Sequence, residues 1–105
     1  IRSVMVKGIE ALTAEMMLAA TAAGVVDEVL ASLDASEKPQ PWAQRAAYNI
    51  ERMTTHGLRR AAEMAESVQT LSSLGVDPVM TRGTVQRQQE QAGHSLDDIL
   101  KRSEA

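Results

Sequence analysis

A lysine interrupts an otherwise apolar helical pattern near the start of the chain. In "SVMVKGIEALTAEMM", residues 3–17, Lys7 shares one helix face with Ser3, Glu10 and Ala14. The spacing alone favours a solvated lysine in an ordinary i,i+3 ion pair with Glu10. The alternative is a cationic group that binds the anion of a substrate.

A second group of basic residues lies near the middle of the chain. His56, Arg59 and Arg60 lie in line with Glu63 and Ser67 at helical spacing. A solvated polar face is the default interpretation of this pattern. The alternative is a cleft wall that binds a carboxylate or a phosphate.

One carboxylate falls on the apolar side of the first helical pattern. Glu15 lies among Ala11, Leu12, Leu18 and Ala19. A carboxylate in this position is either partly buried and hydrogen-bonded to a neighbouring helix, or exposed at the edge of the apolar face.

Several kinds of chemistry are excluded by residue type and spacing. The sequence has no cysteine, so thiolate zinc sites and thiol catalysis are ruled out. Its two histidines, His56 and His94, are far apart and not in a metal-ligand spacing, so no metal site is predicted. No nucleophile–base pair, glycine-rich phosphate loop or carboxylate cluster can be identified.

The charge and hydropathy patterns narrow the class of protein. The formal net charge of −3 argues against a nucleic-acid module, which needs a basic face. No apolar run reaches the roughly 18 residues of a membrane span, and no signal peptide is apparent. We therefore expect a soluble, cytoplasmic domain that binds neither nucleic acid nor membrane.

The sequence of 105 residues has few large apolar side chains. They make up 44% of the sequence, but many are alanine, and there are six methionines, one tryptophan, one tyrosine and no phenylalanine. Aromatic side chains bury the most area per residue, so the core is expected to be thin. Some helix faces are therefore expected to be completed by another domain or subunit.

The periodicity is helical from end to end, and no strand pattern is present. In the first half of the chain we expect a helix ending at Gly24, a second helix over 25–33, a loop over 34–41, and a third helix from Pro41 and Trp42 to about Thr55. After a break at "THG" (55–57), a long helix is expected to end at Gly75. The next helix is expected to have Asp77 as N-cap and Pro78 at its first position, to run to about Gln91 and to stop at Gly93, before a last short helix capped by Ser95. The predicted fold is all-α, a bundle of five to six helices.

The first helical pattern has no capping residue. Helices usually start at a Ser, Thr, Asp or Asn, whereas "IRSVMV" is already in mid-pattern at Ile1. We expect that the first helix begins upstream and that the chain is a fragment of a longer protein.

Three stretches of the chain carry a resemblance to a known family. The stretch "TAEMMLAATAAGV" (13–25) resembles a "TAEA…LA…G" helix, "HGLRRAAEMAESVQTLSSLGVDPVMT" (56–81) resembles "KDLxLA…A…G…P", and "AGHSLDDILK" (92–101) resembles a closing "G…D.SAL" helix. These are motifs of the helical C-terminal domain of the 6-phosphogluconate dehydrogenase-like and β-hydroxyacid dehydrogenase superfamily, and the chain is most similar to a poorly characterised subgroup of it.

The resemblance also implies roles for individual residues. The catalytic lysine of the family would fall two residues before Ile1, so the chain itself contains no catalytic residue. Ser3 would stand at the position of the family asparagine. Val6 and Lys7 would stand where the phosphogluconate enzymes have a glutamate acid and a substrate-binding tyrosine, and the subgroup commonly has "TKG" where this chain has "VKG". Val6 cannot donate a proton, so the mechanism of those enzymes does not transfer in full, but Lys7 could still bind substrate.

The resemblance also places a residue in the cleft between substrate and cofactor. His56 would stand at the position of a lysine that lines this cleft in the family, and Gly57 at that of an aspartate. The resemblance thus implies Ser3, Lys7 and His56 as substrate-binding residues.

Residues 1–105 would then form the substrate-binding and dimerisation domain of an NAD(P)-dependent oxidoreductase that acts on a hydroxyacid. A preceding N-terminal Rossmann domain of the same parent chain would hold NADP or NAD. The further partners implied are a second copy of the chain and a small acidic substrate. The alternative, from another class of protein, is a free-standing helical interaction module without catalytic activity.

Overall fold

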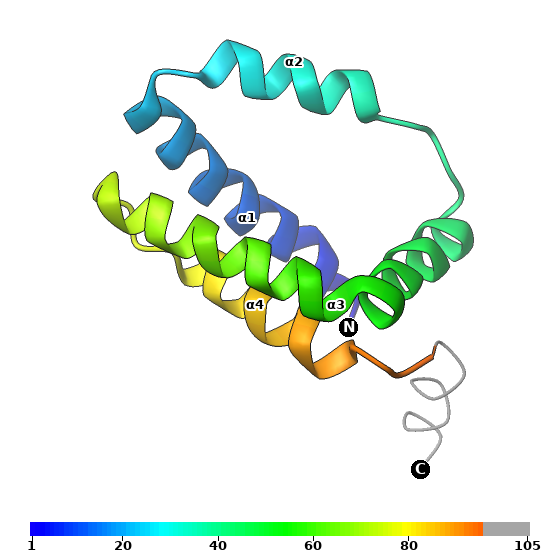
Figure 1. Cartoon of the computed structure of the whole chain (residues 1–105). Helices are drawn as coiled ribbons and strands as arrows, with labels where there is room; N and C mark the ends of the chain where they lie inside the picture. The colour runs from blue at the N-terminus through cyan, green and yellow to red at the C-terminus, as the bar shows by residue number, and fades with distance from the viewer. Residues whose placement is uncertain (96–105) are drawn as a thin grey trace.

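The computed structural model describes residues 1–95, which form four helices and no strand. These are α1 (Arg2–Ala23), α2 (Val26–Ser36), α3 (Trp42–Ser73) and α4 (Val79–Gln91) (Figure 1). The prediction of an all-α fold is confirmed, whereas the prediction of five to six helices is wrong for the described part of the chain. The last predicted helix, after Ser95, lies outside the described residues.

Glycines end three of the helices where the sequence predicts. Gly24, Gly75 and Gly93 have φ angles of 72°, 77° and 83°, in the left-handed region that glycine adopts without steric cost. The loop after α2 is shorter than predicted, because α2 continues to Ser36.

The predicted break at residues 55–57 is wrong, since α3 runs through Gly57 without interruption. Gly57 is buried where α4 crosses α3. A Cβ atom at this position would collide with the carbonyl oxygen of Gln88 and lie 3.1 Å from the Cβ of Ala92. The backbone N–H of Gly93 also donates a hydrogen bond to the carbonyl of Thr54, at 3.1 Å. This glycine therefore allows a close helix crossing and does not end a helix.

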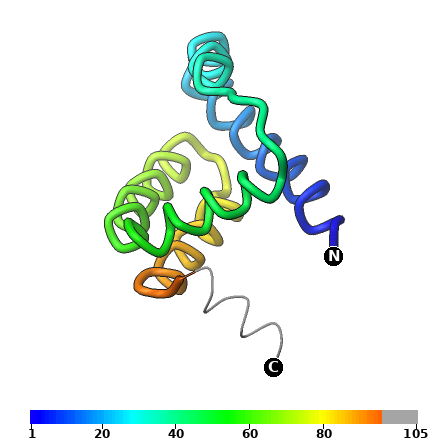
Figure 2. The backbone as a smooth tube through the Cα atoms, turned by 90° about the vertical axis from the view of Figure 1, so that its right-hand side faces the viewer, coloured from blue at the N-terminus to red at the C-terminus, as the bar shows by residue number. Residues whose placement is uncertain are grey.

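The packing of the four helices is uneven. α3 and α4 lie side by side, whereas α1 contacts only α2 and α4 closely, and both views show α2 apart from the α3–α4 pair (Figures 1 and 2). None of the helices in residues 1–95 is long and apolar enough to cross a membrane.

The core of the described region is as thin as its composition predicts. The only buried hydrophobic residues within 1–95 are Ala20 and Ala61, which are 5% and 2% exposed. Large apolar side chains remain exposed on every helix; they include Val4, Met5, Val6, Ile9, Leu12, Leu18, Leu30, Leu33, Trp42, Tyr48, Leu58 and Val79. The helices thus leave apolar faces that they do not cover themselves.

Candidate functional site

The carboxylate of Glu15 ties α1 to the start of α4. It accepts hydrogen bonds from the backbone N–H groups of Met80 and Thr81, both at 2.7 Å, and from the Thr81 hydroxyl at 2.6 Å. Glu15 is only 7% exposed. Of the two alternatives left open by the sequence, burial with hydrogen bonds to a neighbouring helix is confirmed.

This contact caps α4 from another helix. The first N–H groups of a helix have no partner inside it, and a side-chain oxygen usually satisfies them. Pro78 is the N-cap residue and cannot do so, so Glu15, which lies 65 residues before Met80 in the sequence, takes this role. The prediction that Asp77 caps this helix is wrong, because its carboxylate is bound by Arg82 at 3.0 Å instead.

The pKa of Glu15 is lower than that of an ordinary glutamate. Burial acts to raise this pKa, but it is outweighed by the hydrogen bonds from Thr81 and Met80 and by the charge of Arg82. The ionised form is therefore the one that the fold stabilises.

The stability of the protein should depend on pH through Glu15. Because the folded-state pKa lies below the unfolded-state pKa, the unfolded chain binds the proton first as the pH falls. The contribution of Glu15 should be fully present above the ordinary glutamate pKa of about 4.3, and be lost as the pH falls through the lower folded-state value. We expect the difference in unfolding free energy between the wild type and Glu15→Gln, measured in urea, to be constant near neutral pH and to shrink in acid.

Glu90 provides a matched control for this experiment. Hydrogen bonds from Gln86 and Arg87 also lower the pKa of Glu90, but its carboxylate is on the surface, where solvent screens the interaction. Glu90→Gln should leave the pH profile of stability almost unchanged. A wild-type profile parallel to that of Glu15→Gln down to acid pH would show that Glu15 does not contribute in this way.

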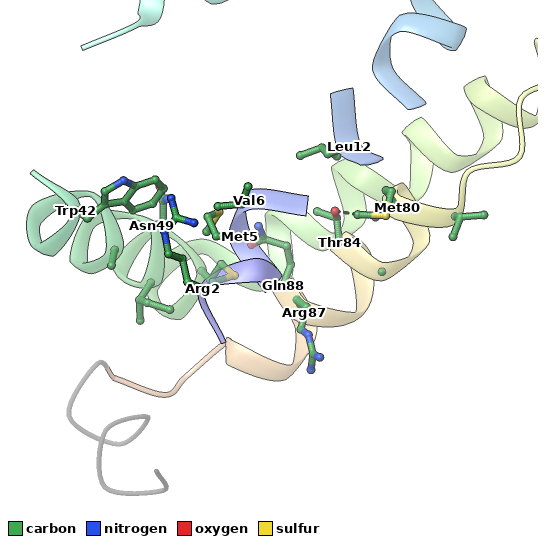
Figure 3. Close-up of a pocket in the computed structure, with 15 residues that line it drawn as sticks. Arg2, Met5, Val6, Leu12, Trp42, Asn49, Met80, Thr84, Arg87 and Gln88 are labelled. Atoms are coloured by element: carbon green, nitrogen blue, oxygen red, sulfur yellow. Dashed lines mark hydrogen bonds between the residues drawn. The ribbon is translucent and has the colours of Figure 1, made fainter. Parts of the chain in front are cut away.

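An open apolar groove lies between the first half of α1, the first half of α3, and α4. It has a volume of about 990 Å³. Its apolar lining residues are Met5, Val6, Leu12, Trp42, Ala46, Ile50, Met53, Val79 and Met80. In Figure 3, Met5 and Val6 of α1 lie between the α3 side chains on one side and the α4 side chains on the other.

The groove also has a polar part, whose charged side chains are both arginines. Its polar side chains are Arg2, Asn49, Thr84, Arg87 and Gln88, and no carboxylate lines it. Arg87 is engaged by Glu90 at 2.8 Å, whereas Arg2 forms no ion pair with any residue in 1–95. The groove is therefore apolar with a basic edge.

The proposed substrate-binding residues do not meet in one pocket. Ser3 and Lys7 are exposed on α1 and are not among the residues that line the groove. Lys7 is exposed, as its ordinary interpretation as a solvated lysine predicts, but the predicted ion pair with Glu10 is not formed. His56 is half-buried and lines a separate pocket of about 440 Å³ that includes no α1 residue.

The polar face around His56 is partly solvated, as its default interpretation predicts. Arg59, which shares the pocket of His56, is paired with Glu63 at 3.8 Å, and both side chains are largely exposed.

Two features of this region could not be identified from the sequence. The cap that Glu15 provides depends on Met80 and Thr81, and no local pattern indicates a partner so distant. The basic edge of the groove combines Arg2 with Arg87, from opposite ends of the described chain. The signal that was available was the single carboxylate on the apolar face of α1.

The comparisons with known proteins identify one family. A search of the curated proteins and a search of the solved structures each found no match to the chain. The family described as a domain of unknown function, DUF1932, matches residues 20–91, which include α2, α3 and α4. The match covers more than half of the sequence, and the chain belongs to the DUF1932 family.

Proposed function

We propose that this chain is the substrate-binding and dimerisation domain of an NAD(P)-dependent oxidoreductase that acts on a hydroxyacid-type substrate. The proposal starts from the three stretches that resemble the C-terminal helical domain of the 6-phosphogluconate dehydrogenase-like superfamily. These stretches occur in the same order as in that superfamily and span nearly the whole chain.

The observation that carries the proposal is the open groove beside the first half of α1. A protein that functioned as these helices alone would leave Met5, Val6 and Trp42 about half exposed to water, at a cost in apolar hydration. A two-domain enzyme would instead use such faces for a preceding domain and for a second subunit. The segment of α1 that lines the groove is the one that the resemblance places directly after the catalytic lysine.

The dinucleotide would be held mainly by the preceding domain. Residues 1–95 include no strand–turn–helix unit of the kind that binds a pyrophosphate, so these helices would supply substrate and subunit contacts. When bound, NAD or NADP would accept or donate the hydride. Lys7 and Ser3, exposed on α1, would bind the acidic substrate, and His56 would contribute from α3.

The substrate role of Lys7 can be tested by kinetics on the natural-length protein. Lys7→Ala should raise the KM for an acidic substrate by about tenfold, because a hydrogen bond between charged groups contributes about 1.5 kcal/mol or more. The kcat and the helix content should change little. Lys38→Ala, in the loop between α2 and α3, is the control and should behave like the wild type. Unaltered kinetics for Lys7→Ala would assign this lysine to the solvated surface.

His56→Ala should raise the KM in the same way if His56 faces the substrate. Wild-type kinetics for this variant would remove His56 from the site and leave the pocket beside it without a role in catalysis.

The open groove also suits the alternative, a helical interaction module without catalytic activity. Dinucleotide binding separates the two functions. A natural-length protein that binds neither NADH nor NADPH would favour the interaction module.

A further inference from the structure

The apolar surface of helix α2 is only partly covered in the described chain, where Val29 lines a pocket together with residues of α1 and α3. None of its residues is buried, and Leu30 and Leu33 are 40% and 49% exposed. Its charged residues are all acidic: Asp27, Glu28 and Asp34. α2 is therefore an amphipathic helix with a purely negative polar side.

The groove is also apolar, but its charge is opposite to that of α2. It is apolar along its length and carries Arg2 and Arg87 but no carboxylate. An acidic amphipathic helix matches such a groove in both properties. Its apolar side chains fill the groove, and its carboxylates meet Arg2, which has no ion pair within residues 1–95, and Arg87, which Glu90 already engages.

The α2 of the same chain does not fill this groove. The groove lies beside the first half of α1, from Arg2 to Leu12, whereas α2 follows the last turn of α1 after Gly24. No residue of α2 is among those that line the groove. In Figure 1, α2 begins beyond the far end of α1 and runs back towards the start of α3, apart from the α3–α4 pair.

We propose that α2 of a second copy of this chain docks in the groove, and that the exchange is reciprocal about a two-fold axis. The inference deepens the dimerisation part of the proposed function by naming the two surfaces that meet. The pairing is self-complementary, since each chain offers one acidic helix and one basic groove. A dimer that joined groove to groove would instead place the arginines of both copies opposite one another, which like-charge repulsion disfavours.

The experiment is a charge exchange between two variants of the chain. Variant one carries Glu28→Lys and Asp34→Lys in α2, and variant two carries Arg2→Glu and Arg87→Glu in the groove. Each alone should dimerise at least about tenfold more weakly than the wild type, measured by analytical ultracentrifugation, because like charges meet at both contacts. An equimolar mixture should restore a heterodimer, since both contacts then join opposite charges.

A spectroscopic measurement and a control variant accompany the charge exchange. Trp42 is the only tryptophan and lines the groove, so its emission should shift to shorter wavelength in the wild-type dimer and in the mixture, but not in either variant alone. The control is Glu66→Lys, an exposed reversal on α3 away from the groove, which should dimerise like the wild type.

Three results would overturn the inference. They are a monomeric wild type throughout the accessible concentration range, a dimer that the α2 reversals leave intact, and a mixture that fails to associate although each variant has wild-type helix content. The second result would leave dimerisation itself in place, and none of the three would bear on hydride transfer, which is measured separately by nicotinamide reduction.

Discussion

Glu15→Ala is expected to lower the free energy of unfolding by about 3 kcal/mol, because it leaves buried polar groups at the start of α4 without partners. The N–H groups of Met80 and Thr81 both lose their acceptor, and so does the hydroxyl of Thr81. Pro78 cannot replace the cap. The loss would be large for a domain of this size, whose total stability is of the order of 5–15 kcal/mol.

Urea denaturation followed by circular dichroism measures this effect. Glu10→Ala is the matched control, since Glu10 is exposed on the same helix, and its stability should lie within about 0.5 kcal/mol of the wild type. Glu15→Gln should fall between the two, because its amide oxygen can still accept a hydrogen bond from α4. Equal stabilities for Glu15→Ala and Glu10→Ala would mean that the contact between α1 and α4 does not support the fold.

Gly57→Ala is expected to destabilise the protein by about 2 kcal/mol, because the added methyl group has no space between α3 and α4. Its Cβ would meet the carbonyl oxygen of Gln88, and a backbone oxygen cannot move aside as the end of a flexible side chain can. The two helices would have to separate at the crossing, which also strains the hydrogen bond from Gly93 to Thr54.

Gly8→Ala provides the comparison, because Gly8 also lies within a helix but a Cβ there would have no neighbour within 4 Å. Alanine is the better helix former, so this variant should be more stable than the wild type by roughly 0.5–1 kcal/mol. Thermal unfolding of both variants gives the sign directly. A stabilising Gly57→Ala would contradict the close crossing of α3 and α4.

The sequence predicted the local features of this fold well and the tertiary ones poorly. Gly24, Gly75 and Gly93 end helices because a left-handed residue is a local requirement that glycine meets without steric cost. Gly57 is needed for a different reason, because its lack of a side chain allows the close contact between α3 and α4. A single sequence does not distinguish a glycine needed for its φ angle from one needed for its size.

The same limit applies to the site. The apolar surroundings of Glu15 indicated that this carboxylate needed a partner or a place at the edge, because an unpaired buried charge is costly. They could not indicate Thr81, and Asp77 looked like the cap because it precedes Pro78 directly. The scarcity of aromatic residues did predict a thin core, since buried area follows from composition before any contact is known.

The most direct measurement of the central claim is nicotinamide reduction by the natural-length protein, followed by absorbance with a panel of hydroxyacids and either NAD or NADP. The proposed function predicts saturable turnover of at least one hydroxyacid, with a higher KM in Lys7→Ala. A folded protein that binds neither dinucleotide and oxidises no member of the panel would contradict it.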